Sequence, residues 1–520
     1  MKSGRRLCGA AATILLGMMV LGYLAAAFCI DLSVTPSFYT TDMYADVMVS
    51  VEMWEQKTLF PSNWVFGNQL YVFATPVLSS LIYGITGNAF RSMGAAAFLM
   101  GVLVLASFFW MLGGIFPKVR ERLFALVAFL VMVVLFGDAV LTMNGWQLFF
   151  TMCAYYACYA ISAFLTFGCY LRSETKCSPV MTVLACLLSF AMGIQSLRQT
   201  AVMVLPLLAM EAWEMLSRVR RKEPVRSNGT VIAVSVSATN AFGLICSHFL
   251  QVNQYTIFGK MGLVPLRQLP ETALDSAKNA CSLFSRDTIH PNTAYQVVLV
   301  VALLVALVVF WRSGRQSRGR LMALLSLSVL CVLAIDTVTT MQIRGIYYFM
   351  LFPLAACLLA NLYADRSLAV RVLALLALSA AFLFSFNREV EPRLDRVRDR
   401  KSEISYVIQD DLLDRGFTTV YSCWNGCEKI AAASFGKLQA GFWHGAGEPF
   451  SPVTYLCDPA IYTAQPEKSA YVFYGEEEAE AGRKRAEQKQ IKMTLVASYP
   501  EKSIYIYTAP VNLLEVFSES

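Results

Sequence analysis

Four charged side chains have the types and positions to do chemistry in this chain. Asp42 and Asp46 lie four residues apart, whereas Arg198 and Arg344 each lie at the end of a long apolar run. A carboxylate can take a proton from a hydroxyl group, and the planar guanidinium of arginine matches the oxygens of a phosphate. The alternatives are structural. Two acids one helical turn apart can simply face water, and arginines can anchor the ends of membrane spans.

The composition shows what kind of elements must position these residues. Of the 520 residues, 57% are apolar and 15% are charged, and the mean hydropathy is +0.53. Ordinary soluble domains are about 45–50% apolar and about 25% charged, so the chain is not a soluble globular enzyme. The net charge of +7 is not gathered on one face, as binding to nucleic acid requires, and we expect no nucleic-acid partner.

Apolar runs of about 20 residues predict eleven transmembrane helices. They cover residues 7–30, 92–116, 122–143, 146–170, 179–196, 199–215, 229–250, 295–312, 320–340, 345–364 and 368–387. Residues 70–85 are apolar over a shorter stretch that contains Pro76 and Gly84, which predicts an interfacial or re-entrant helix. The first run also fits a cleaved signal peptide, but its length favours an uncleaved anchor.

The distribution of lysine and arginine predicts the orientation in the membrane. Of the 43 basic residues, 19 fall at the N-terminus and in loops on one side, and 8 fall in loops on the other side. The positive-inside rule then places the N-terminus in the cytoplasm of a multi-pass protein of the plasma or inner membrane. Residues 31–91, 251–293 and 388–520 are expected outside the cytoplasm, where any chemistry would take place.

Residues 1–387 therefore form the membrane module, and residues 388–520 a separate extracytoplasmic α/β domain. A charged linker at 388–401 is followed by a predicted helix at 405–415, by strands at 417–424, 470–474 and 494–507, and by a helix at 476–489. The three cysteines of this domain, Cys423, Cys427 and Cys457, make a zinc site improbable and leave a disulfide open.

The order of motifs in the first outer loop resembles a known family. Asp42 follows the first span within Thr-Asp-Met-Tyr-Ala-Asp, and Glu-Met-Trp-Glu at 52–55, Leu-Phe-Pro at 59–61, Gln-Leu-Tyr at 69–71 and a Pro-bearing helix come next. This order resembles the integral-membrane GT-C glycosyltransferases, and within them the bacterial branch of protein mannosyltransferases and the aminoarabinose transferase of lipid A. Gln-Ser-Leu-Arg at 195–198 and Ile-Arg-Gly-Ile-Tyr-Tyr at 343–348 look like two later outer turns of that family.

The resemblance implies a GT-C-like module that moves a sugar from a polyprenyl-phosphate carrier to an acceptor in the cell envelope, with inversion. It makes Asp42 the catalytic base and places Arg198, Arg344 and Tyr347 at the donor phosphate. The family pattern often has adjacent acids, whereas Met43 follows Asp42 here, so Asp46 is the candidate second acid. Some relatives use a divalent metal ion and others do not, so a metal is possible and no other cofactor is implied.

Two other classes of function stay open. A transporter or flippase of lipid-linked or small polar substrates would show internal repeats and charged residues at the bilayer midplane, and we find no repeat. A membrane sensor would leave the loop motifs without a role. Several aromatic residues also have structural interpretations. Tyr347, Tyr348, Trp54, Trp64 and Trp146 fit an aromatic belt, and Tyr421, Trp424 and Trp443 fit either a domain core or a platform for sugar rings.

Overall fold

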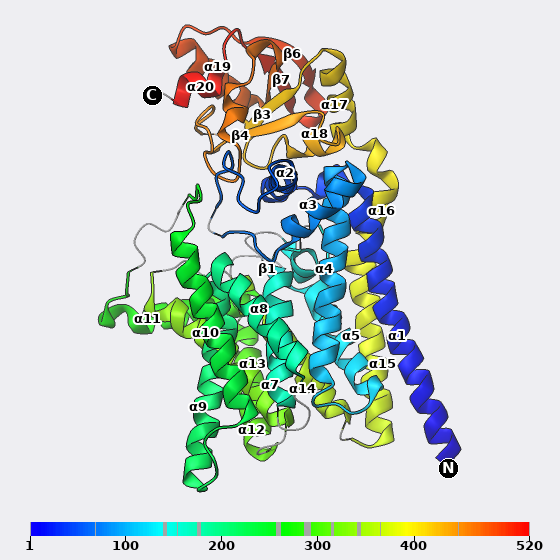
Figure 1. The fold of residues 1–520 in the computed structure, drawn as a ribbon. Coiled ribbons are helices and arrows are strands. Elements are labelled where there is room, and N and C mark those ends of the chain that lie inside the picture. The colour runs from blue at the N-terminus through cyan, green and yellow to red at the C-terminus, as the bar shows by residue number, and fades with distance from the viewer. Residues whose placement is uncertain are drawn as a thin grey trace.

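A bundle of long helices carries a small α/β domain at one end (Figure 1). The computed structural model describes residues 2–67, 69–138, 143–152, 154–173, 178–255, 262–284, 293–313, 317–340, 345–364, 366–445 and 447–518. The short helices α2 and α3 lie between the bundle and the domain, and the N-terminus lies at the opposite end of the bundle. This confirms a mostly helical module followed by a C-terminal α/β domain.

The bundle is built from the helices of the first three quarters of the chain. They are α1 (Lys2–Ser33), α2 (Thr41–Glu55), α3 (Thr75–Thr86), α4 (Ala89–Leu112), α5 (Val119–Leu135), α6 (Gly145–Phe149), α7 (Ala157–Arg172), α8 (Pro179–Gln195), α9 (Leu205–Arg220), α10 (Asn228–Phe249), α11 (Leu269–Ser282), α12 (Thr293–Ser313), α13 (Ser317–Val338), α14 (Leu351–Ala364) and α15 (Leu368–Ser385).

Within the described residues, seven helices are long and apolar enough to cross a membrane. They run over Gly9–Ser33, Ala89–Leu112, Thr200–Arg220, Asn228–Phe249, Ser317–Val338, Gly345–Ala364 and Leu368–Asp414. The predicted spans 179–196 and 295–312 correspond to α8 and α12. At 12 residues α3 is about 18 Å long, which is too short to cross about 30 Å of hydrocarbon.

Two of the eleven predicted spans are not continuous helices. The helix predicted over 122–143 ends at Leu135 and is followed by the short strands β1 (Gly137–Asp138) and β2 (Met143–Asn144). The helix predicted over 146–170 is broken between α6 and α7, where Met152 and Ala154 have positive φ angles. The carboxylate of Asp31 accepts a hydrogen bond from the Met152 N–H at 2.6 Å and thereby holds this break. Hydropathy alone does not detect such tertiary contacts.

Small residues allow close helix packing in the bundle. A Cβ atom on Gly193 of α8 would collide with the Asn240 carbonyl of α10, and one on Gly243 of α10 would collide with the Phe190 carbonyl of α8. In lipid, helices associate through such close packing, because lipid tails are as apolar as the side chains. These two glycines therefore fix α8 against α10 and set the position of the turn after α8.

The C-terminal domain has a mixed five-stranded sheet with the strand order β4-β3-β5-β7-β6. Strands β3 (Thr419–Cys423), β4 (Gln439–Trp443) and β5 (Ser469–Tyr474) are parallel, whereas β6 (Thr494–Tyr499) and β7 (Ile504–Thr508) are antiparallel neighbours. Helices α16 (Glu391–Asp399), α17 (Ile404–Asp414), α18 (Glu428–Ala433), α19 (Glu476–Gln488) and α20 (Leu513–Ser518) complete it. The α/β prediction is confirmed, although β4 was not predicted and the linker at 388–401 is helical.

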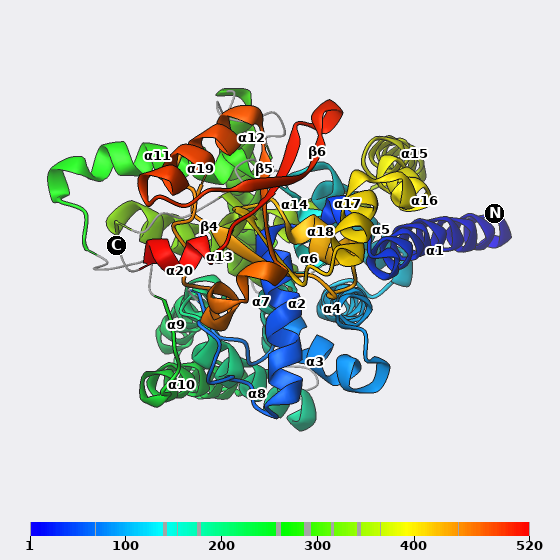
Figure 2. The same ribbon diagram turned by 90° about the horizontal axis from the view of Figure 1, so that it is seen from above.

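The domain lies over the membrane module with α18 next to α2 (Figure 2). Thr41 and Asn425 bind each other reciprocally, with the Thr41 N–H donating to Asn425 Oδ1 and the Asn425 N–H donating to Thr41 Oγ1. The Ala440 N–H donates to the Tyr44 hydroxyl at 2.9 Å. The domain therefore rests directly on the helix that carries Asp42. Cys423, Cys427 and Cys457 are free thiols in the structure.

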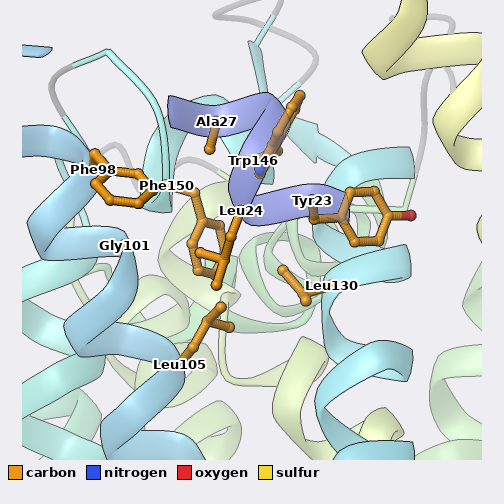
Figure 3. A pocket seen from close by; sticks show the side chains of 9 residues that line it. All are labelled: Tyr23, Leu24, Ala27, Phe98, Gly101, Leu105, Leu130, Trp146 and Phe150. Carbon is orange, nitrogen blue, oxygen red and sulfur yellow. The ribbon is translucent and has the colours of Figure 1, made fainter. Parts of the chain in front are cut away.

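A narrow apolar crevice lies between α1, α4, α5 and α6 (Figure 3). It is too narrow to hold a water molecule and is lined by Tyr23, Leu24, Ala27, Phe98, Gly101, Leu105, Leu130, Trp146 and Phe150. The Tyr23 hydroxyl is hydrogen-bonded to Ser385. None of the predicted site residues lines the crevice, so it is a gap in the packing of the bundle.

Candidate active site

Asp42 lies in the first turn of α2, at the junction of the bundle and the C-terminal domain. Thr40 caps this helix, because its side chain accepts a hydrogen bond from the Met43 N–H. A negative charge in the first turn is stabilised by the positive end of the helix dipole. Asp42 is partly exposed, and its charge acts on Tyr455 of the C-terminal domain. The predicted base therefore lies at a boundary that a substrate could reach.

Asp46 lies one helical turn after Asp42 but is only 2% exposed. Its Oδ1 accepts a hydrogen bond from the Tyr71 hydroxyl at 2.7 Å. Burial raises the pKa of Asp46 to about 8, the Tyr71 hydrogen bond opposes this rise, and the Asp42 charge adds to it. At neutral pH the candidate second acid is therefore a neutral carboxylic acid, so it is poorly suited to be a second base.

Replacing Asp46 with Asn is expected to remove a pH dependence of stability. The folded protein keeps the Asp46 proton up to a pKa of about 8, whereas the unfolded chain loses it near the ordinary aspartate pKa of 3.8. The proton on Asp46 therefore contributes its full share to the free energy of unfolding below about pH 4. This contribution falls by up to about 1.4 kcal/mol per pH unit as the pH rises, and it is lost above about pH 8. Thermal unfolding is measured in detergent from about pH 5 to about pH 9, and the stability of Asp46→Asn is expected to change less with pH than that of the wild type. Parallel profiles of the two proteins would contradict a buried neutral acid at this position.

A loop segment at 69–73 connects α2 to the start of α7 and the end of α8. Tyr71 binds Asp46 on one side, while Gln69 accepts a hydrogen bond from the Tyr159 hydroxyl at 2.9 Å on the other. The Gln195 side chain accepts from the backbone N–H groups of Val72 and Phe73 at 3.2 and 3.1 Å. Gln195 ends α8, three residues before Arg198. The motif at 69–71 therefore positions the acidic helix relative to the arginine turn.

Arg198 is partly buried among three tyrosines. Its guanidinium donates to the Tyr347 hydroxyl at 2.9 Å and lies 4.2 Å from the Tyr347 ring centroid, 5.3 Å from that of Tyr156 and 5.2 Å from that of Tyr159. Among the residues that the structure describes, no carboxylate lies within 4.0 Å of this guanidinium. Aromatic faces attract the cation but do not neutralise it, so Arg198 keeps its charge for another anion.

The structure brings Arg198 and Tyr347 together, whereas Arg344 lies outside the described residues. Tyr347 belongs to the short turn Gly345–Tyr348. The next residue, Tyr348, is 0% exposed and donates to Asp336 Oδ2 at 2.7 Å. The aromatic-belt interpretation is therefore wrong for Tyr348, and also for Trp64 and Trp146, because all three are buried in the protein.

Several residues around the site were not found from the sequence. Tyr156 is the N-cap of α7 and Tyr159 lies in its first turn, beside a break in a helix that was predicted as continuous. Gln195 belongs to one of the motifs of the sequence but had no predicted role of its own. Three tyrosines within five residues of an apolar run were the signal that could have pointed to them. Of the domain aromatics, Tyr421 and Trp443 are core residues at 0% exposure, whereas Trp424 is partly exposed.

The described residues contain no group of three or more His, Cys, Asp or Glu side chains that could hold a metal ion.

Solved structures with a similar fold were found, although no family model and no curated protein sequence matches the chain. ArnT from Cupriavidus metallidurans bound to undecaprenyl phosphate is 11% identical with a TM-score of 0.52, covering 96% of this chain and 99% of ArnT. The apo state of the same protein is 12% identical with a TM-score of 0.51, covering 97% of this chain and 99% of ArnT. The oligosaccharyltransferase of Archaeoglobus fulgidus, solved in a complex with zinc and sulfate, is 13% identical with a TM-score of 0.44. The match covers 94% of this chain and 73% of that protein. The expected resemblance is confirmed at the level of architecture: this chain has the GT-C fold.

Proposed function

We propose that the protein is a membrane glycosyltransferase that moves a sugar from a polyprenyl-phosphate carrier to an acceptor of the cell envelope. Arg198 carries this proposal. It is a partly buried cation with no carboxylate partner among the described residues, and it is connected through residues 69–73 to the helix of Asp42. ArnT shares the fold and has been solved with undecaprenyl phosphate, a phosphate-bearing lipid of the proposed class.

In the proposed reaction, Asp42 takes the proton from an acceptor hydroxyl as its oxygen attacks the anomeric carbon of the donor sugar. The bond between this carbon and the phosphate oxygen breaks, and the polyprenyl phosphate leaves with the electron pair. Arg198, oriented by Tyr347, stabilises the negative charge on the departing phosphate, as does Arg344 in this proposal. One carboxylate suffices for this single displacement, which inverts the anomeric centre.

We further propose that the site faces the outer side of the plasma or inner membrane. The C-terminal domain and α2 lie at the end of the bundle opposite the N-terminus. The loops with the most lysine and arginine belong, by the positive-inside rule, to the cytoplasmic side together with the N-terminus. A lipid-linked sugar presented on the outer face would then meet Asp42 beneath the domain.

An assay of membranes that contain the protein tests this function. The membranes are incubated with a panel of radiolabelled polyprenyl-phosphate sugars and an envelope extract, and transfer of label to the extract is measured. At least one donor is expected to give transfer above the level of membranes that contain Asp42→Asn at equal abundance. Absence of transfer from every donor by folded wild-type protein would contradict the proposal.

A further inference from the structure

Three aromatic rings from separate segments lie in a row next to α2, and two of them are stacked face to face. Tyr255 lies parallel to Tyr455, with ring centroids 4.8 Å apart and planes 12° apart, and Trp424 lies 5.8 Å from Tyr455 on a plane tilted by 34°. Tyr255 comes from the outer loop after α10, and the other two rings come from the C-terminal domain. We call these three residues the aromatic platform.

The backbone holds the aromatic platform in place from one side. The Tyr255 N–H donates to the Phe66 carbonyl at 2.8 Å, and the N–H of Leu456, which follows Tyr455, donates to the Val65 carbonyl at 2.8 Å. Two consecutive residues of the first outer loop therefore fix both stacked rings. A binding surface that is already ordered loses little conformational entropy when a ligand arrives.

Two independent connections place the aromatic platform beside Asp42. Trp424 precedes Asn425, whose N–H donates to the side chain of Thr41, the neighbour of Asp42. In addition, the Asp42 charge acts on Tyr455. The platform and the proposed base therefore lie on the same side of the junction between the domain and the module.

The platform is the exposed end of a longer row of aromatic side chains. The ring centroid of Trp424 lies 5.9 Å from that of Phe442, and the Phe442 centroid lies 6.0 Å from that of Tyr44 on α2. Phe442 and Tyr44 are both buried. At the other end Tyr255 is 41% exposed, and Tyr455 and Trp424 are partly exposed. Packing of the domain on α2 accounts for the buried end of the row, but it does not account for the exposed rings.

We infer that the aromatic platform binds a sugar ring of the acceptor, so that the acceptor is a carbohydrate and a hydroxyl of that ring or its neighbour reaches Asp42. This inference rests on the proposed function and specifies its acceptor. A pyranose has an apolar C–H face that lies flat on an aromatic ring, and a rim of hydroxyl groups that suits a carboxylate. The nearby Asp42 charge disfavours an anion, so the donor phosphate belongs at Arg198 instead.

Saturation-transfer NMR on the full chain in lipid nanodiscs tests the platform without turnover. Saturation of protein aromatic protons is measured on maltotriose, mannotriose and chitotriose, with a Ser/Thr-containing peptide as the competing class. The wild type is expected to transfer saturation to ring C–H protons of at least one oligosaccharide. Tyr455→Ala and Trp424→Ala are expected to reduce this signal at least fivefold, whereas Tyr455→Phe and Tyr505→Ala, the latter on strand β7, retain it.

Unchanged signals in both alanine variants, no saturation of any oligosaccharide, or saturation of the peptide alone would overturn the inference. Release of polyprenyl phosphate from labelled donor is measured on the same samples. If oligosaccharide binding depends on the platform but no donor reacts, the proposed function fails and the platform stands. If donor reacts but the platform variants match the wild type in both binding and acceptor KM, the platform fails and the proposed function stands.

Discussion

Asp42→Asn is expected to abolish measurable sugar transfer while leaving the folded protein intact. The amide cannot accept the proton of the attacking hydroxyl, and loss of a positioned general base lowers kcat by about 10²- to 10⁴-fold. Asn keeps the size of the side chain, and the partly exposed position in the first turn of α2 tolerates the loss of charge. The measurement is initial rate of transfer at saturating donor, with thermal unfolding as the check on folding.

Two other aspartates serve as comparisons for this variant. Asp395→Asn removes an exposed acid that pairs with Arg398 at 2.7 Å on α16, and its kcat is expected to match the wild type. Asp46→Asn is expected to lose less than about tenfold in kcat, because a buried acid that is neutral near pH 7 supplies no base. Normal turnover by Asp42→Asn, or a larger loss in Asp46→Asn than in Asp42→Asn, would contradict the assignment of the base.

Arg198→Ala is expected to raise the KM for the polyprenyl-phosphate donor by about 10- to 100-fold. A charge-assisted hydrogen bond contributes about 1.5–3 kcal/mol, and each 1.4 kcal/mol corresponds to about a tenfold change in affinity. Arg198→Lys keeps the charge but loses the planar fork that Tyr347 orients, so about half of this free energy is expected to be lost. Donor KM and acceptor KM are measured separately, and the acceptor KM is expected to change little.

Arg91→Ala provides a matched control for Arg198→Ala. Arg91 lies in the first turn of α4, is exposed, and contacts the Phe435 ring of the C-terminal domain at 5.8 Å. It therefore shares the junction between bundle and domain but is not connected to residues 69–73. An unchanged donor KM in Arg198→Ala, or an equal rise in both variants, would remove Arg198 from the donor site.

The parts of the fold that hydropathy and charge control could be predicted from the sequence. Long apolar runs such as 92–116 and 229–250 correspond closely to α4 and α10, because lipid requires each crossing segment to satisfy its own backbone hydrogen bonds. The run of apolar and aromatic residues at 470–474 likewise corresponds to β5. In both cases local composition carries enough of the folding free energy to specify the element.

Features that depend on distant contacts could not be predicted in this way. The break before α7 depends on Asp31, which lies 121 positions earlier in the chain. The burial of Asp46 depends on Tyr71, and the enclosure of Arg198 depends on Tyr156, Tyr159 and Tyr347 from two other segments. The sequence indicated Asp42 and Arg198 as residues with suitable chemistry, but only the fold shows which side chains surround them.

Native mass spectrometry of purified variants with a reactive polyprenyl-phosphate sugar tests the central claim most directly, because it separates binding from chemistry. Asp42→Asn is expected to retain the intact donor, since the donor site at Arg198 is complete but the base is missing. Arg198→Ala is expected to bind little donor, and the wild type in the presence of acceptor is expected to show free polyprenyl phosphate. Intact donor bound equally by Asp42→Asn and Arg198→Ala would contradict the division of roles between these two residues.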